Sequence, residues 1–504
     1  MKASTGKFSI VLLKLLFLAV GLLSLSSCVK KQKPSYILLA VDRLAFNSFS
    51  CNDEKNFSNS GIAVLCQESI RFTNAFTTST QSAAALGSLL SGTYPFQNQL
   101  HRSTSRINHE ITLASEIFKS QSYRTAFFSA NANVMKRTGL ARGFDLFDDS
   151  SFLNYPSYTV PFNDQVGHFK DWVDEDSDSP YFSVIYNSDL ETLRFDENFT
   201  ARAEEFDENL FNFIQYLKKE QQWEKNYIIV VGLQGRSEYN RLNETKYSNL
   251  HSENINVSFF IKPPRLKGDE GINLKIDSTS NLADFGYSLI KLISPTTVTK
   301  KTDEFSTLDY SKLWSTNRLE SKLDVNTNPN RPIVAEAIDT WSTELSLRFA
   351  LLFGNYIYVE KLKPELFNKL NDGLETIDLK KTNPDIYLQA ESQLGRVRQL
   401  ADALVWNTDA TIAYEQFNTS KLYWTNSNNR EPLFEAEKKR LSLKQPPTPI
   451  STLLIYYLDT KKTKDAVYDE ARRATYNLAF ENIWGLWNKE KKWPQPPALT
   501  NENQ

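Results

Sequence analysis

The stretch Ile228-Ile229-Val230-Val231-Gly232-Leu233-Gln234-Gly235 decides the fold. Its first four residues are apolar and β-branched, which predicts a strand buried on both faces, as in parallel sheets. The two glycines predict a tight turn directly after this strand. Sites of open α/β sheets lie beyond the carboxyl ends of the strands, so Leu233 and Gln234 stand where a metallohydrolase would carry ligands. Leucine cannot ligate a hard cation, and an amide oxygen is a weak, uncharged substitute.

Other apolar runs alternate with amphipathic helical stretches on both sides of this segment. The predicted strands are Ile37–Val41, Tyr123–Phe128, Tyr181–Tyr186, Tyr227–Val231 and Val257–Ile261. Predicted helices between them include Ala83–Leu90 and Ala203–Lys218. This alternation predicts an α/β fold with helices on both faces of the sheet.

Short sequence blocks follow one another along the first three quarters of the chain. They are Pro34–Asp42, Ser69–Thr78, Leu89–Pro95, Thr112–Phe118, Tyr123–Phe128, Gly143–Asp148, Phe206–Leu210 and, near the end, Glu365–Asn368 with Glu375-Thr376. In this order they resemble the sulfatase family of the alkaline-phosphatase superfamily. The resemblance implies a mixed, mainly parallel sheet flanked by helices, with a smaller C-terminal α+β subdomain.

Composition and pattern divide the chain further. We expect a sulfatase-like α/β domain at 35–295, a linking loop at 296–335, a C-terminal sulfatase-like subdomain at 336–384 and a helical tail at 385–504. In the tail, one helical face carries Val467, Ala471, Ala474 and Leu478, and a cluster among lysines carries Trp484, Trp487 and Trp493. Such a cluster either contacts lipid headgroups or packs on the neighbouring domain, and packing is the commoner role of an apolar helix face.

The resemblance assigns candidate roles to individual residues. Asp42 stands at the first metal-ligand position, and Ser82 at the position of the nucleophile, which family enzymes oxidise to formylglycine. Leu86 replaces the arginine that follows the nucleophile, and Leu233 and Gln234 replace the Asp-His pair that holds the metal. Asp42 is thus a residual metal ligand. Ser82 is either a nucleophile that acts directly or merely the cap of the helix that follows it.

Two cationic residues are candidates for binding an anion. Arg43 follows Asp42, and Lys246 lies near a cationic position of the family, where it would also assist catalysis. If the site has been rebuilt, the acids of the Asp189–Glu191 loop or Glu238 would replace the lost ligands.

The histidines that the family uses are not in their usual places. Asn98 stands where many relatives have one, and His101 is close but out of register. We expect His251 to be a surface histidine rather than a catalytic acid.

These replacements predict a sulfatase-like protein that is catalytically impaired or inactive, a pseudoenzyme that binds an anionic glycan or a protein partner. The alternative is an active hydrolase or transferase of sulfuric or phosphoric esters, with Ser82 as its nucleophile. We expect no cofactor in the first case, and a divalent cation (Ca²⁺, Mg²⁺ or Zn²⁺) only if the site has been rebuilt. The near balance of 60 acidic and 58 basic residues argues against a nucleic-acid partner.

The first 27 residues predict a lipoprotein signal peptide. Lys2 and Lys7 precede the apolar stretch Ile10–Leu25, and Leu25-Ser26-Ser27-Cys28 resembles a bacterial lipobox. Cys28 would carry the lipid and begin a tether at 28–34, which anchors the protein in the cell envelope. Val29 favours the outer membrane, with the protein facing the periplasm or the exterior. The alternative is an uncleaved transmembrane anchor.

With Cys28 lipidated, Cys51 and Cys66 are the cysteines that remain. They either pair in an oxidising compartment or stay as two buried thiols. A disulfide that closes so short a loop would add about 3 kcal/mol to the free energy of unfolding.

Overall fold

The computed structural model describes residues 33–398 except 50, 52–58, 104, 156, 158, 192–198, 238–248, 266–271, 297–306, 316–330, 339–346 and 362. The chain divides into two compact units, Met1–Pro34 and Ser35–Gln504. The predicted signal peptide, Cys28 and the tail beyond 398 lie outside the described residues. In the part that is described, no helix has the length and apolar character needed to cross a bilayer.

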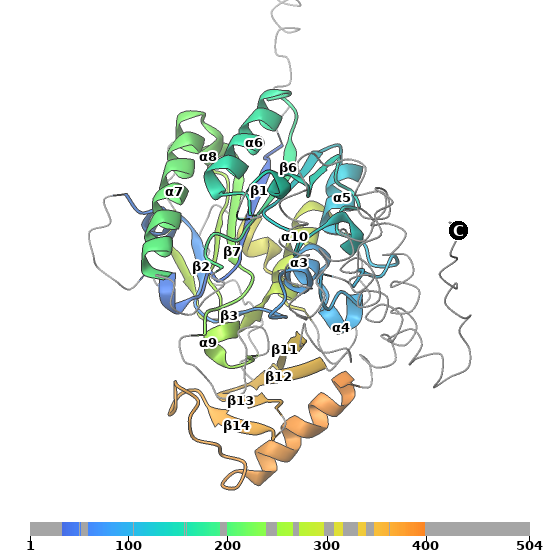
Figure 1. Cartoon of the computed structure of the whole chain (residues 1–504), viewed down its shortest axis with the longest axis vertical. Helices are drawn as coiled ribbons and strands as arrows, with labels where there is room; N and C mark the ends of the chain where they lie inside the picture. The colour runs from blue at the N-terminus through green and yellow to red at the C-terminus, as the bar shows by residue number, and fades with distance from the viewer. Residues whose placement is uncertain are drawn as a thin grey trace, which may run out of the picture. The chain divides into compact units, whose positions relative to one another are not determined.

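An eight-stranded sheet forms the centre of the second unit (Figure 1). Across the sheet the order is β5 (Leu146–Asp148), β4 (Arg124–Ser129), β6 (Tyr181–Asn187), β1 (Tyr36–Val41), β7 (Tyr227–Gly232), β8 (Phe259–Lys262), β2 (Ile70–Phe72) and β9 (Leu274–Ile276). Neighbouring strands are parallel except that β8 is antiparallel to β7 and β2. The predicted mixed, mainly parallel sheet is confirmed.

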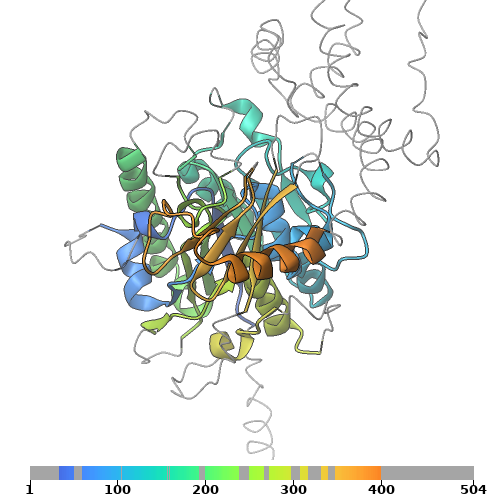
Figure 2. The ribbon, with the colours of Figure 1, turned by 90° about the horizontal axis from the view of Figure 1, so that it is seen from below.

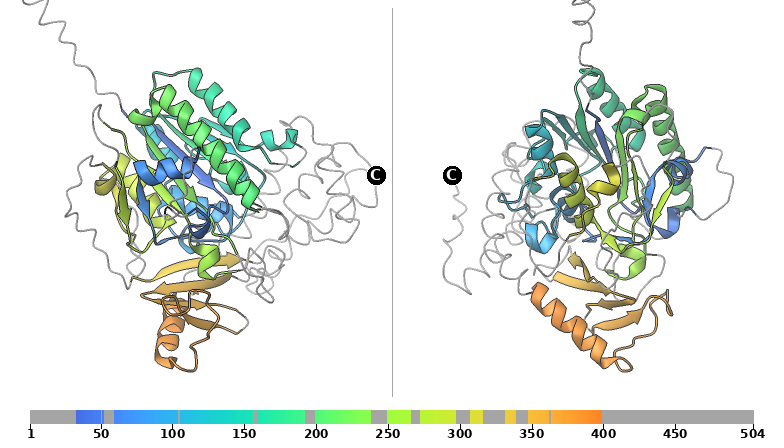
Figure 3. Two further views of the ribbon diagram at one scale, coloured as in Figure 1. Left: turned by 90° about the vertical axis from the view of Figure 1, so that its left-hand side faces the viewer. Right: turned by 180° about the vertical axis from the view of Figure 1, so that it is seen from behind.

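Helices cover both faces of this sheet (Figures 1 and 3). One face carries α3 (Ser82–Ser91), α5 (Ala114–Ser120) and α10 (Leu282–Ile293), and the other carries α2 (Gly61–Glu68), α6 (Phe162–Asp174) and α7 (Phe199–Lys219). Because successive side chains of a strand point to opposite faces, Leu38 and Ala40 join the first core, and Ile37 and Leu39 the second. All six residues of β1 are buried, as an unbroken apolar run predicts.

Short elements connect the main ones. The helical ones are η1 (Asn47–Phe49), α4 (Pro95–Asn98), η2 (Lys136–Thr138), η3 (Ser151–Asn154), α8 (Gln222–Lys225), α9 (Ser252–Ile255) and α11 (Ser311–Ser315), and β3 (Ala75–Phe76) pairs with β10 (Ser280–Asn281). Helix α11 lies inside the stretch where the sequence predicts a linking loop, 296–335. A disulfide between Cys51 and Cys66 joins α2 to the segment after η1.

The C-terminal subdomain is a four-stranded antiparallel sheet with one helix (Figure 2). Its strands are β11 (Ile333–Ile338), β12 (Leu347–Phe353), β13 (Tyr356–Val359) and β14 (Glu365–Asn368), and a helix over 384–398 crosses them. β11 meets the segment that leads into α3, because Glu336 N donates to the Thr78 carbonyl at 2.9 Å and Thr80 N to the Glu336 carbonyl at 3.1 Å. The subdomain therefore borders the segment that carries Ser82.

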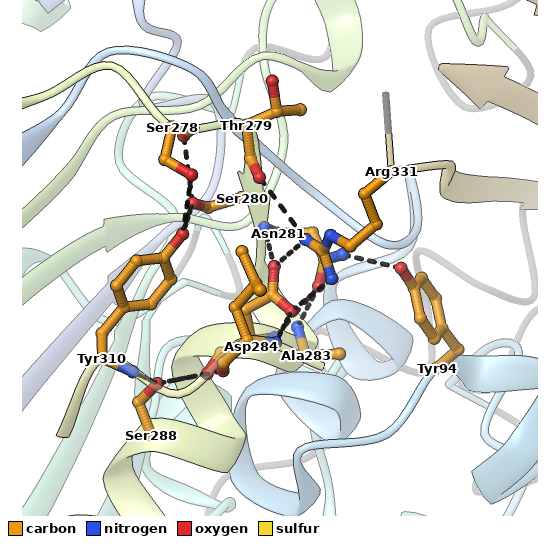
Figure 4. Close-up of polar contacts among 11 residues, drawn as sticks. Tyr94, Ser278, Thr279, Ser280, Asn281, Ala283, Asp284, Ser288, Tyr310 and Arg331 are labelled. Carbon is orange, nitrogen blue, oxygen red and sulfur yellow. Dashed lines mark hydrogen bonds and ion pairs between the residues drawn. The ribbon is translucent and has the colours of Figure 1, made fainter. Parts of the chain in front are cut away.

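A buried ion pair fixes the start of α10 against the chain that enters β11 (Figure 4). Arg331 donates to both carboxylate oxygens of Asp284, with 2.8 Å between Nη1 and Oδ1. Asn281 caps α10, its Oδ1 accepting from Asp284 N at 3.0 Å, and its Nδ2 donates to the Tyr94 hydroxyl at 2.7 Å. Both charged side chains are buried, so the pair depends on its geometry and on the surrounding hydrogen bonds.

Candidate functional site

Three strands end side by side at one edge of the main sheet. Val41 of β1 is in register with Asn187 of β6 and with Gly232 of β7. Asp42 therefore follows β1 at the same edge at which Leu233 follows β7. Asp42 N donates to the Asn187 carbonyl and Leu233 N to the Val41 carbonyl, both at 2.9 Å. This is the carboxyl edge, where sites of such sheets lie.

Helix α3 brings Ser82 to this edge. Ser82 Oγ donates to Asp42 Oδ1 at 2.8 Å and accepts from Gln234 Nε2 at 3.0 Å. The Tyr186 hydroxyl, from β6, donates to Asp42 Oδ2 at 2.6 Å. We call Asp42, Ser82, Tyr186 and Gln234 the Asp42 cluster. The alternative that Ser82 caps its helix is wrong, because the N-cap is Gln81 and no side chain caps the helix.

The Asp42 cluster is almost closed to solvent. Its side chains are buried, and Ser82 retains 9% exposure. Burial raises the pKa of the Asp42 carboxyl to about 6, and the charge of Glu191 adds to the rise, while hydrogen bonds from Tyr186 and Ser82 oppose it. Burial and the nearby Asp42 charge raise the pKa of Tyr186 well above its ordinary value. Tyr186 therefore stays protonated and remains a donor to Asp42.

Arg43 turns away from the Asp42 cluster. Its φ of +59° is left-handed, a strained conformation for a residue other than glycine. Its Nε lies 2.8 Å from Glu191 Oε2, and its Nη1 donates to Asn254 Oδ1 at 2.7 Å and to the Gly235 carbonyl at 3.2 Å. The charge that the sequence assigns to anion binding is thus balanced by Glu191, and an incoming anion would compete with that carboxylate.

The donor set at this edge does not fit a divalent cation, which needs several oxygen ligands. Asp42 supplies one carboxylate, and both of its oxygens already accept hydrogen bonds. Leu233 is fully buried and apolar, and Gln234 turns its amide nitrogen toward Ser82. Among the described residues, no group of three or more His, Cys, Asp or Glu side chains is placed to hold a metal ion. Within the part of the chain that the structure describes, the cation that the family resemblance implies therefore lacks its ligands.

Two of the three acids proposed to rebuild such a site, Asp189 and Glu191, have other partners. Asp189 Oδ2 accepts from Phe162 N at 3.0 Å, which places it at the start of α6, and Glu191 is paired with Arg43. Lys246 and Glu238 lie outside the described residues. The proposed catalytic and anion-binding roles of Lys246 therefore stay predictions from the sequence.

Two histidines are buried, each beside a glutamate of the C-terminal subdomain. His101 Nδ1 lies 2.9 Å from Glu336 Oε1, and His251 Nδ1 lies 2.7 Å from Glu375 Oε2. The expectation that His251 is a surface histidine is wrong, since its side chain is fully buried. Asn98, the last residue of α4, is buried and hydrogen-bonds to Thr93 and Leu100 on either side of this helix. His101 and His251 thus link the main domain to β11 and to the loop after β14.

Sequence reasoning missed three polar residues at this edge. Tyr186 belongs to an apolar run that looks like core, yet its hydroxyl holds Asp42. Asn131 follows β4 and Ser188 follows β6, and Asn131 Nδ2 donates to Ser188 Oγ at 2.9 Å. Their positions in the sequence could have revealed Asn131 and Ser188, because a polar residue just after a parallel strand lies at the carboxyl edge of the sheet, where the site is.

A mainly parallel sheet with the site at its carboxyl edge is the fold of the alkaline-phosphatase superfamily, to which the matching family model belongs. The sulfatase family model matches residues 34–294, and the chain belongs to the sulfatase family. The comparison with curated proteins found no match.

Several solved structures share the fold at low sequence identity. A sulfatase of glycosaminoglycan metabolism from Bacteroides thetaiotaomicron is 15% identical, with a TM-score of 0.57, covering 73% of this chain and 100% of that one. The phosphonate monoester hydrolase of Agrobacterium radiobacter is 14% identical, with a TM-score of 0.55, covering 73% and 96%. The protein Ps i-CgsB, solved with a neocarrahexaose, is 15% identical, with a TM-score of 0.54, covering 72% and 92%. At these identities the likeness concerns the fold alone.

Proposed function

We propose that this sulfatase-family protein does not hydrolyse sulfate esters by metal-dependent chemistry and instead binds a ligand. The observation that carries the proposal is the Asp42 carboxylate, whose two oxygens accept hydrogen bonds from Ser82 and Tyr186. A metal contributes several kcal/mol to the transition state of such hydrolysis. Leu233, Gln234 and the single Asp42 carboxylate do not supply the ligands that would hold such a metal ion, so its stabilisation of the transition state is lost.

The ligand we propose is an anionic glycan or a protein partner, in the bacterial envelope. Two of the similar structures concern glycosaminoglycan metabolism and a complex with a neocarrahexaose, which supports a glycan. The N-terminus of α3 supplies backbone N–H groups that favour an anion. The lipid anchor at Cys28 belongs to this proposal as well, and intact-protein mass tests it, since an unprocessed Met1 terminus would contradict a lipoprotein.

The second candidate is an active ester hydrolase with Ser82 as its nucleophile. It is favoured by one observation, the 2.8 Å hydrogen bond from Ser82 Oγ, at the start of α3, to the buried Asp42 carboxylate. A carboxylate in that position can take the proton of an attacking hydroxyl.

Turnover separates the two candidates. The full chain is assayed with 4-nitrophenyl sulfate and 4-nitrophenyl phosphate, with and without added Ca²⁺, Mg²⁺ or Zn²⁺, beside Ser82→Ala and the control Ser88→Ala on the same helix. We expect no turnover that depends on both a metal and Ser82. Metal-dependent turnover that Ser82→Ala abolishes and Ser88→Ala retains would overturn the proposal. Metal-independent turnover lost with Ser82 would support the second candidate.

A further inference from the structure

Two buried amide side chains beside Ser82 end in atoms that have no hydrogen-bond partner among the described residues. These atoms are Oε1 of Gln234, which bonds Ser82, and Nε2 of Gln81, the N-cap residue of α3. Gln234 retains 2% exposure and Gln81 9%, so both residues are at least nine-tenths buried. A buried polar atom without a partner costs free energy, which makes each of these atoms a candidate contact for a bound ligand.

The hydrogen bonds of the Asp42 cluster determine which end of the Gln234 amide is left over. An ionised carboxylate only accepts, so Asp42 takes the single hydroxyl hydrogen of Ser82 at 2.8 Å. Ser82 Oγ can then only accept from Gln234, whose Nε2 lies 3.0 Å away. The nitrogen of this amide is therefore directed to Ser82, and Oε1 remains as an acceptor that requires a donor from a ligand.

The charge at this end of α3 is already negative. Burial raises the pKa of Asp42 to about 6, so the carboxylate is mostly ionised at pH 7.5. Arg43, the next residue in the chain, is paired with Glu191 at 2.8 Å, so its charge does not offset a further anion. The N-terminus of a helix favours a negative charge, and the Asp42 carboxylate, bonded to Ser82 in the first turn, supplies it.

A sulfate group and a hydroxyl group would therefore meet this site differently. Sulfate oxygens only accept hydrogen bonds, so they leave Gln234 Oε1 without a donor and bring a second negative charge toward Asp42. A hydroxyl group can donate to Gln234 Oε1 and accept from Gln81 Nε2, and it brings no charge. Ser82 and Gln81 each retain 9% exposure, so a ligand group would reach the site on their side.

We propose that the Asp42 cluster binds an unsulfated sugar hydroxyl, and that Gln234 selects this group over a sulfate ester. Such binding presupposes the proposed function, a glycan ligand at this site, and names the group of the glycan that contacts Gln234. The acidic groups of the glycan then lie away from the Asp42 cluster. Gln234, which stands where the family resemblance expects a metal-ligand histidine, determines specificity instead.

Binding to matched oligosaccharides tests the proposal. The full chain is applied at pH 7.5 to an array of chondroitin and carrageenan hexasaccharides, each printed with its sulfate esters and after their chemical removal. Affinities for the pairs that bind are then measured by calorimetry. The variants are Gln234→Met, Asp42→Asn and the control Gln121→Met, at the exposed end of α5. Far-UV circular dichroism checks that each variant folds.

We expect the wild type to bind the unsulfated member of a pair at least about tenfold more tightly, because a sulfate beside the Asp42 carboxylate is repelled. Gln234→Met should weaken binding of the unsulfated member about tenfold, since the hydroxyl loses its acceptor, whereas Gln121→Met should not change it. Asp42→Asn should strengthen binding of the sulfated member and narrow the preference. This variant tests the role of charge even where Gln234→Met does not fold.

Tighter binding of the sulfated member by the wild type would overturn the proposal and leave a glycan-binding function in place. A preference for the unsulfated member that a folded Gln234→Met variant retains would also overturn it. Binding of neither member of any pair would contradict the glycan ligand itself, and with it the hydroxyl site, and would leave a protein partner as the ligand.

Discussion

Asp42→Asn should stabilise the protein, although it removes the one carboxylate of the Asp42 cluster. Burial is the largest cause that raises the pKa of Asp42 from its ordinary 3.8 to about 6. Between these two pH values the folded protein holds a proton that the unfolded chain has released. Folding stability therefore falls as the pH rises through that interval, and the cost is fully present above about pH 6. The difference corresponds to about 3 kcal/mol, an upper estimate for the gain from Asp42→Asn.

The assay is chemical denaturation of the wild type and Asp42→Asn near pH 7.5 and near pH 4, with and without a chelator. We expect Asp42→Asn to gain about 1–3 kcal/mol near pH 7.5, because Asn still accepts one hydrogen bond while losing the buried charge. Near pH 4 the gain should shrink toward zero. A loss of stability in Asp42→Asn near pH 7.5, matched by a wild type that the chelator destabilises, would refute the reasoning, since a bound cation would then be stabilising the carboxylate.

Three further predictions concern the fold. Arg331→Met leaves Asp284 buried without its ion pair and should lower the free energy of unfolding by about 3–5 kcal/mol. The control Lys275→Met, whose partner Asp277 is exposed, should change it by less than about 1 kcal/mol. Similar losses for both variants in denaturant titrations would count against the importance of the buried ion pair. Replacing Cys51 and Cys66 by serine should cost about 3 kcal/mol, and a reductant should then have no further effect on the thermal midpoint. Burial lowers the pKa of Lys262 to about 7, so the folded protein carries a buried charge below that pH and loses it as the pH rises through 7. Because the unfolded chain keeps its proton up to the ordinary 10.5, the cost of this burial is full below pH 7 and shrinks as the pH rises toward 10.5. Lys262→Met should therefore stabilise the protein more near pH 6 than near pH 10, and an equal change at both would contradict this.

The strands were predictable because their signal is local. The run Ile228–Val231 is apolar on both faces, and it forms β7 in the middle of the sheet. Leu233 was expected at the carboxyl edge, and it lies there, fully buried. At these positions the apolar residues of the sequence are the buried residues of the structure, since a parallel strand covered by helices on both faces exposes no side chains to solvent.

The partners of the polar side chains were not predictable, because they come from distant parts of the chain. Ser82 looks like a helix cap from its neighbours, but its hydroxyl bonds Asp42, 40 residues away. His251 looks like a surface residue in a polar loop, but Glu375, 124 residues away, receives it in the interior. Local propensity cannot anticipate such pairs, since they exist only once segments distant in the sequence have packed together.

Metal content tests the central claim most directly. The full-length protein is purified without chelators, and divalent metal per chain is determined by elemental mass spectrometry. Our account predicts a content far below one ion per chain, since Asp42 with Leu233 and Gln234 does not supply the ligands that a divalent cation needs. About one ion per chain, retained through purification, would contradict it and would show that the site has been rebuilt from ligands other than those assigned here.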